Sequence, residues 1–258
     1  MKLGLLADIH EDIIRLNESI EILNDFKVDE IINLGDFVGF CVPYYSYLRT
    51  RDANKVVSWL KENCQVSIAG NHDLYAIRKV PVNSDAFEYL ENWYDLDYDV
   101  REKYTDKRIW LYENDELSPM LNAESKNYIR SLPEYLVKEY GSYNILFSHY
   151  GYPDITGCLT AKIREVSNLK PQLDFMKRNN CLYGFSGHDH NENITILTED
   201  EKIELDFNEK YILPDKPLWL TIPCVANGTK ANGLAIFDTD TREIVAIPLN
   251  TPPHVVEE

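Results

Sequence analysis

Five of the six histidines lie in short motifs that also contain aspartate, asparagine or glycine. Carboxylate oxygens, amide oxygens and imidazole nitrogens are the ligands that divalent cations bind in proteins. Two cations held together need roughly eight such ligands, so the motifs could supply one site between them. In chain order they are Asp8-Ile9-His10, Gly35-Asp36, Gly70-Asn71-His72-Asp73, Ser148-His149 and Gly187-His188-Asp189-His190.

The spacing within these motifs suits a pair of cations. Asp8 and His10 are two positions apart, so an extended strand end places both side chains on one face, where they can chelate one ion. Asp36 has two carboxylate oxygens and can bridge two ions about 3.5–4 Å apart. His188 and His190 bracket a predicted turn and can serve different ions. Each motif alone is commonly a cap, a turn or a packed histidine, but their joint order favours one site.

The elements before residue 74 would bring the first three motifs together. Asp12 is well placed as the N-cap of the first helix. In open α/β sheets ligands bind beyond the carboxyl ends of the strands, so motifs in those positions converge on one edge. The predicted elements are strands at 2–7, 29–34 and 66–69 and helices over 13–26 and about 44–62.

Residues 74–133 are rich in aromatic and charged side chains, and we expect them to form a helical insertion beside the site. The favoured interpretation is that the aromatic rings of the insertion form an ordinary core. The alternative is contact with substrate, in which a base stacked on one ring would add roughly 1–3 kcal/mol. The candidate rings for stacking are Tyr89, Trp93, Tyr94 and Trp110.

The sequence after residue 133 predicts more strands than helices. Strands at 134–139, 143–148 and 182–186 are expected, the last ending on Gly187-His188, with a helix at about 166–179. Five β-like stretches follow without intervening helices, which suggests antiparallel pairing and a second sheet. They lie at 193–198, 202–206, 217–222, 233–238 and 243–248.

In this order the motifs resemble those of the calcineurin-like phosphoesterase family, from Asp8 to the C-terminal strands. The resemblance implies an α/β sandwich of four layers, with two mixed sheets face to face and helices outside. It also implies that a metal-activated hydroxide attacks phosphorus, while His72 binds no metal and assists the leaving group. The implied ligands are Asp8, His10, Asp36 and His190 for one metal and Asp36, Asn71, His149 and His188 for the other.

Two segments narrow the resemblance. Residues 35–43 are similar to the Gly-Asp-x-Val-Gly-Tyr-Gly-Pro segment of a bacterial and archaeal subgroup, and residues 222–228 are similar to that subgroup's Asn-Pro-Gly-Ser-Val-Gly loop. The family's Ser/Thr protein phosphatases carry an Asp-Arg pair shortly after the bridging aspartate. Here Phe37-Val38-Gly39-Phe40 stands in that place, which argues against the protein phosphatase class.

Composition limits the remaining possibilities. The chain has 258 residues, 44% of them hydrophobic, and no low-complexity linker, which predicts a single domain over 1–258. A net charge of −17 disfavours long nucleic acid, whose affinity comes from Lys and Arg. No segment reaches the roughly 18 apolar residues of a membrane helix. Five widely spaced cysteines without a Cys-x-x-Cys pair favour a cytoplasmic protein with reduced thiols.

The sequence therefore predicts a metal-dependent hydrolase of a small phosphate monoester or diester, with no other cofactor. Mn, Fe, Zn and Ni all suit mixed nitrogen and oxygen ligands. Two other hypotheses remain. One is a scaffold of the same fold that binds a protein and has lost catalysis, and the other is a nuclease. The complete ligand set disfavours the first, and the acidic charge disfavours the second. His254, in the Pro-rich tail, lies outside any motif and is expected to play no part.

Overall fold

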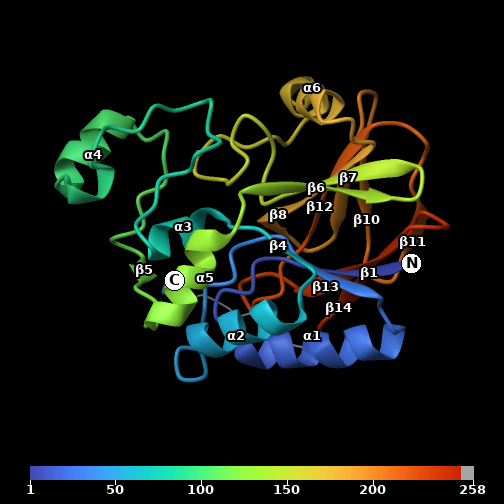
Figure 1. Cartoon of the computed structure of the whole chain (residues 1–258), viewed down its shortest axis with the longest axis horizontal. Helices are drawn as coiled ribbons and strands as arrows, with labels where there is room; N and C mark the ends of the chain where they lie inside the picture. Colours follow the sequence, from blue (N-terminus) through green and yellow to red (C-terminus); the bar gives the residue numbers. More distant parts are fainter. Residues whose placement is uncertain (251–258) are drawn as a thin grey trace.

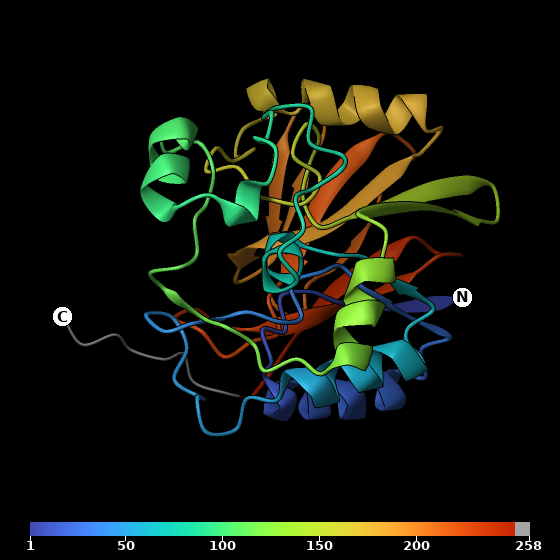
Figure 2. The ribbon, with the colours of Figure 1, turned by 60° about the vertical axis from the view of Figure 1, so that its left-hand side comes forward.

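Two six-stranded sheets packed face to face form the centre of the protein (Figure 1). The computed structural model describes residues 1–250. Buried apolar side chains from both sheets, among them Leu5, Phe185 and Phe237, fill the space between the sheets. Helices lie against the two outer faces (Figure 2). The predicted α/β sandwich of four layers is therefore confirmed.

The first sheet joins the predicted N-terminal βαβ unit to the last strands of the chain. Its parallel part is β1, β2 and β4, and the other strands are antiparallel to their neighbours. In spatial order the strands are β11 (Lys210–Ile212), β14 (Glu243–Pro248), β13 (Gly233–Asp238), β1 (Lys2–Leu6), β2 (Glu30–Asn33) and β4 (Val66–Ser67).

The second sheet has a parallel centre and antiparallel edges. Its strands, in spatial order, are β10 (Lys202–Leu205), β9 (Ile194–Leu197), β12 (Leu218–Pro223), β8 (Tyr183–Asn191), β7 (Tyr143–Ser148) and β6 (Tyr135–Tyr140). Two features of the five C-terminal stretches differ from the prediction. β13 and β14 pair in the first sheet, and β12 pairs in parallel with β8 as well as antiparallel with β9. Alternating apolar residues show that a strand has a buried face but do not show which sheet it joins.

Helices α1 (Ile13–Phe26) and α2 (Ala53–Asn63) cover the first sheet, whereas α6 (Lys170–Arg178), after the 3-10 turn η2 (Val166–Asn168), covers the second. Asp12 caps α1 as predicted. The predicted helix over 44–62 is shorter in the structure, because Asp52 caps α2 and the residues before it form turns. No helix within residues 1–250 has the length and hydropathy needed to cross a bilayer.

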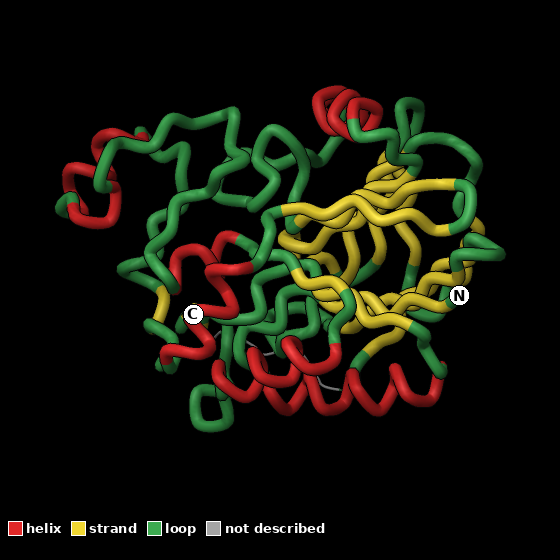
Figure 3. Tube along the Cα trace, in the orientation of Figure 1, coloured by secondary structure: helices red, strands yellow, loops and turns green. Residues whose placement is uncertain are grey.

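Only part of the insertion at 74–133 is helical, and most of it is loop (Figure 3). Its outermost helix lies away from the two sheets (Figure 1). Contacts between rings, rather than regular backbone hydrogen bonds, hold much of the segment together. Its elements are the end of α3 (Asn71–Ala76), the 3-10 turn η1 (Trp93–Asp95), the outer helix α4 (Tyr98–Thr105), β5 (Glu116–Leu117), which pairs with β3 (Phe40–Cys41), and α5 (Ala123–Ser131).

The rings of the insertion form a core of their own. Phe87 and Trp93 are buried, and Tyr89 lies edge-on to Trp93 with ring centroids 5.1 Å apart. Tyr89 and Tyr94 pack against this cluster. Trp110 is 44% exposed and is the one of the four candidate stacking rings on the surface. The favoured interpretation, an aromatic core, therefore describes Tyr89, Trp93 and Tyr94.

Candidate metal centre

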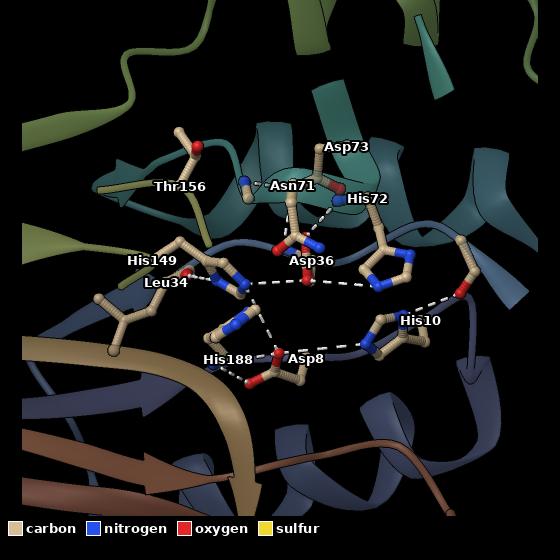
Figure 4. A network of polar contacts seen from close by, with 12 residues as sticks. Asp8, His10, Leu34, Asp36, Asn71, His72, Asp73, His149, Thr156 and His188 are labelled. Carbon is tan, nitrogen blue, oxygen red and sulfur yellow. Dashed lines mark hydrogen bonds and ion pairs between the residues drawn. The ribbon is translucent and has the colours of Figure 1, made fainter. Parts of the chain in front are cut away.

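The parallel strands of both sheets end at one edge, where all seven predicted ligands meet. Figure 4 shows this site with all of them labelled except His190. Each motif lies at the end of β1, β2, β4, β7 or β8. The sheets face each other, so side chains from opposite layers point into one space between the strand ends. The seven are Asp8, His10, Asp36, Asn71, His149, His188 and His190.

The last motif differs in form from its prediction. β8 does not end at Gly187-His188 but continues to Asn191, and its register with β12 shifts beside Thr221. His188 and His190 both have positive φ, 72° and 48°. The motif is therefore an irregular strand end rather than a turn, and the irregularity turns both imidazoles toward the site.

Asp8, His10 and His190 form one cluster of candidate ligands, the Asp8 group. His190 Nε2 lies 3.2 Å from Asp8 Oδ1 and also 3.2 Å from His10 Nε2. His10 Nδ1 is 2.8 Å from the carbonyl oxygen of Gly39, to which it donates. Because that bond occupies Nδ1, the lone pair of a neutral His10 ring lies on Nε2 and faces the group.

Asp36, Asn71, His149 and His188 form the second cluster, the Asn71 group. The amide oxygen of Asn71 lies 3.1 Å from Asp36 Oδ2 and 3.2 Å from both His149 Nε2 and His188 Nδ1. The carbonyl oxygen of Thr156 is 3.0 Å from the same oxygen. An amide oxygen that faces a carboxylate oxygen and a carbonyl oxygen fits a cation among them, so the donor set suits the predicted metal.

Asp36 links the two clusters. Its Oδ1 accepts the backbone N–H of His72 at 2.9 Å, which leaves Oδ2 facing the centre. Oδ2 is 2.8 Å from His149 Nε2, and the same nitrogen is 3.9 Å from Asp8 Oδ1. The carboxylate thus lies at the boundary between the Asp8 group and the Asn71 group.

Strained backbone surrounds these side chains. Left-handed φ values are costly for residues other than glycine, by roughly 1–3 kcal/mol each, and cluster at functional sites. Such conformations re-aim side chains where a strand would otherwise continue. Here they occur at Asp8 (55°), His10 (46°), Asp36 (53°), His188 (72°) and His190 (48°).

The carboxylate of Asp73 holds two of the motif loops together. It accepts the backbone N–H groups of Asp36, Phe37, Val38 and Gly70 at 2.8–3.1 Å. Burial and the neighbouring Asp36 raise the pKa of Asp73 to about 8, although the bonds from Gly70 and Val38 lower it. The four bonds fix the loop after β2 against the start of α3. Asp73 therefore supports the position of Asp36 without facing the centre itself.

Two of the histidines are neutral imidazoles. Burial lowers the pKa of His10, and His72 and His190 lower it further, to about 3. Burial also lowers the pKa of His188 far below its ordinary value, with a contribution from His149. Both rings therefore keep a lone pair for a cation at pH 7.

The other charges of the centre form a buried ion pair. Burial lowers the pKa of His149, but Asp36 outweighs it and raises the pKa to about 10. Burial raises the pKa of Asp36, yet His149 and His72 outweigh this effect and hold it low. Among the described residues, the ion pairs of Asp8 and Asp36 are all with imidazoles. Such buried carboxylates match a site for cations, which would compensate their charge more fully.

His72 lies beside the two groups and has a partner of its own. Its Nε2 faces the centre, 4.0 Å from Asp36 Oδ2, and its Nδ1 contacts the carboxylate of Glu116. Burial lowers the pKa of His72, but Glu116 and Asp36 outweigh it and raise the pKa to about 9. The side chain is 17% exposed, so the ring is within reach of a bound molecule.

Several residues of this site carry no sequence motif. Glu116 and Tyr112 come from the insertion, and the Thr156 carbonyl comes from the loop after β7. No spacing or composition signal marks these three positions. Asp189, within the last motif, pairs instead with Lys162 at 2.9 Å. His254 lies outside the described residues.

Alanine at Gly157 is expected to weaken the Asn71 group selectively. A Cβ at Gly157 would lie 2.5 Å from His188 Nδ1 and 2.9 Å from the Asn71 oxygen, and φ is +80°. The affinity of the Asn71 group for Mn²⁺ should fall roughly 10–100-fold, as for losses of residues that support metal ligands. Calorimetric titration of Mn²⁺ into metal-free protein measures this affinity.

Gly141→Ala is the matched control. Gly141 also has positive φ, +63°, but nothing lies within 4 Å of an added Cβ. This variant shares the backbone cost without the contact, so Mn²⁺ binding should equal that of the wild type. Equal weakening in both variants would show that backbone strain, not contact with the ligands, causes the effect.

The fold is similar to solved structures of low sequence identity. A metallophosphoesterase from Sphaerobacter thermophilus has a TM-score of 0.66 at 16% identity, over 98% of this chain and 89% of that chain. A hypothetical protein from Pyrococcus horikoshii OT3 has a TM-score of 0.56 at 17% identity, over 97% and 88%. These likenesses support the sandwich fold.

No curated protein matches this sequence. The sequence profile of the calcineurin-like phosphoesterases matches residues 1–192, a range that contains His72 and all seven candidate ligands. The match covers most of the chain and agrees with the two ligand groups found at the strand ends. The chain therefore belongs to the calcineurin-like phosphoesterase family and is a phosphoester hydrolase.

Proposed function

We propose that this protein hydrolyses a small phosphate monoester or diester at a pair of metal ions. The Asp8 group together with Asp36 would hold one ion, and the Asn71 group would hold the other. The position of Asp36 is the observation that carries the proposal. A carboxylate oxygen of Asp36 lies within 4.8 Å of ring nitrogens of His10 and His72, and in a second cluster a carboxylate oxygen of Asp36 lies within 4.8 Å of ring nitrogens of His149 and His188.

The ligand set suits several metals. It combines carboxylate and amide oxygens with imidazole nitrogens, which Mn, Fe, Zn and Ni all accept. Bound there, the ions would supply the Lewis acidity that polarises a phosphate and activates a water as nucleophile. Asp8 and Asp36 contribute the negative charge that offsets two neighbouring cations.

His72 is proposed to assist the leaving group. Glu116 occupies Nδ1, so the ring presents Nε2 to the centre, on the side where Asp36 Oδ2 lies. From that position Nε2–H can donate a proton to the departing oxygen or a hydrogen bond to charge that develops on the phosphate. His72 lies within 4.8 Å of ligand atoms of His10 and Asp36, but neither of the two proposed ligand sets includes it.

The accessibility of the site supports a small substrate. Asp8, His10, Asp36, Asn71 and His149 are at most 2% exposed. The side chains of His72 and His190 are 17% and 35% exposed and mark the open side of the centre. With a net charge of −17, the surface offers little attraction for a polymer of phosphates.

A panel of esters tests the proposal. The metal-loaded protein would be assayed with nitrophenyl phosphate, bis-nitrophenyl phosphate, cyclic and dinucleotides, a phosphopeptide and single-stranded DNA. We expect the highest kcat/KM with one of the small esters. A kcat/KM at least about tenfold higher for the phosphopeptide or the DNA would overturn the small-ester proposal.

A further inference from the structure

One short turn of the insertion contacts two consecutive residues of the Gly70-Asn71-His72-Asp73 motif. The hydroxyl oxygen of Tyr112 accepts a hydrogen bond from Asn71 Nδ2 at 2.7 Å. The carboxylate of Glu116 contacts His72 Nδ1. The N–H groups of Asp115 and Glu116 both donate to the carbonyl oxygen of Tyr112, at 3.2 and 2.9 Å, so the turn sets the spacing of Tyr112 and Glu116.

The turn is anchored to the loop that follows the central aspartate. β5 pairs with β3, placing Glu116 opposite Cys41, and the N–H of Val42 donates to the carbonyl oxygen of Asp115 at 2.9 Å. β3 follows Asp36 by only a few residues. The pairing therefore holds Glu116 at a fixed place relative to both the aspartate and His72.

The environment of Glu116 indicates a role at the centre rather than in the fold. Its side chain is 1% exposed, and His72 is the only hydrogen-bond partner of its carboxylate among the described residues. Burying a carboxylate with a single partner costs free energy that an apolar side chain would not cost. The contact instead fixes the ring so that His72 Nε2 faces Asp36.

Tyr112 has a comparable effect on the neighbouring ligand. An asparagine amide can point either its oxygen or its nitrogen at a metal, and only the oxygen can bind one. The Tyr112 hydroxyl can donate or accept, and by accepting from Nδ2 it accommodates the amide orientation in which the oxygen of Asn71 faces Asp36, His149 and His188. The Tyr112 ring also lies against His72, with ring centroids 4.7 Å apart.

We infer that Glu116 and Tyr112 are positioning residues, through which the insertion orients His72 and Asn71. This inference rests on the proposed function. It assigns a different role to each residue: Glu116 affects turnover through His72, and Tyr112 affects metal affinity through Asn71. The two effects are separable, because the hydrogen bond of Glu116 goes to His72 and that of Tyr112 goes to Asn71.

Glu116→Ala tests the first contact. In wild-type protein, ¹⁵N-labelled histidine NMR should show a protected Nδ1–H for His72, and the variant should lose it. With metal content unchanged, kcat should fall roughly 10–100-fold for a phenyl ester and less for the nitrophenyl ester, which needs little protonation. The double variant with His72→Gln should be no slower than His72→Gln alone, within about twofold.

Tyr112→Phe and Asp115→Asn complete the comparison. Tyr112→Phe should lower Mn²⁺ affinity roughly 10–100-fold and regain wild-type kcat at saturating Mn²⁺. Asp115→Asn removes an acid from the same turn that does not contact His72, so the His72 resonance and the kinetics should match the wild type.

Three results, each with a wild type that hydrolyses the ester, would overturn the inference but not the proposed function. They are unchanged kinetics in Glu116→Ala, loss of metal from Glu116→Ala, and a loss of kcat in the double variant that equals the combined losses of the two single variants. Persistence of the Nδ1–H resonance in Glu116→Ala would overturn the contact itself. A wild type that shows the resonance and binds Mn²⁺ but hydrolyses no ester would overturn the proposed function and, with it, the catalytic part of this inference.

Discussion

Replacing Asp36 with asparagine is expected to remove metal from both ligand groups at once and to abolish turnover. Asp36 Oδ2 lies between the groups and pairs with His149 at 2.8 Å. An amide in its place supplies no negative charge to offset two adjacent cations. Activity should fall by about 10³-fold or more, since the metals account for several kcal/mol and each 1.36 kcal/mol is tenfold in rate.

Elemental analysis after incubation with Mn²⁺ and gel filtration measures the metal. Asp189→Asn is the matched control, because Asp189 lies within the last motif but pairs with Lys162. That variant should retain wild-type metal content. If Asp36→Asn kept one ion per chain at full occupancy, Asp36 would belong to a single metal and not to both.

Replacing His72 with glutamine is expected to lower kcat by about 10²–10⁴-fold, the usual range for general acid–base groups. Metal content should stay at the wild-type level, because neither proposed ligand set includes His72. The loss should be larger for a phenyl ester than for a nitrophenyl ester, whose leaving group hardly needs protonation. Steady-state kinetics with both esters, beside elemental analysis, measure the two effects.

The experiment would also reveal a different role for His72. A ring nitrogen of His72 lies within 4.8 Å of candidate ligand atoms of His10 and Asp36, so coordination by His72 is a defined alternative. Loss of one ion from His72→Gln would assign the ring as a ligand. An equal loss for both esters would instead assign it to stabilising charge on the phosphate.

The meeting of the candidate ligands at one place could be predicted from the sequence, because each lies at the end of a recognisable strand. Asp8 follows the apolar run of β1, Asp36 follows β2, and Asn71 follows β4. The carboxyl ends of parallel strands meet at one edge, so position along the chain implied proximity in space. The same argument holds for His149 after β7.

The positioning residues could not be predicted, because their contacts depend on pairing too short to leave a pattern. β3 and β5 have two residues each, and two residues show no periodicity. Glu116 therefore looked like any acid in a charged insertion. The place of β13 and β14 in the first sheet could not be predicted for a related reason. Their sequences show that each strand has a buried face but not which strand lies beside it.

A titration of metal-free protein with Mn²⁺, followed by hydrolysis of bis-nitrophenyl phosphate or nitrophenyl phosphate, tests the central claim most directly. The protein concentration would be held well above the dissociation constants, so that added metal is bound. The two ligand groups, joined at Asp36, predict no activity without metal and a plateau at two equivalents per chain. Full activity in the metal-free protein, or a plateau at one equivalent, would contradict the proposed metal pair.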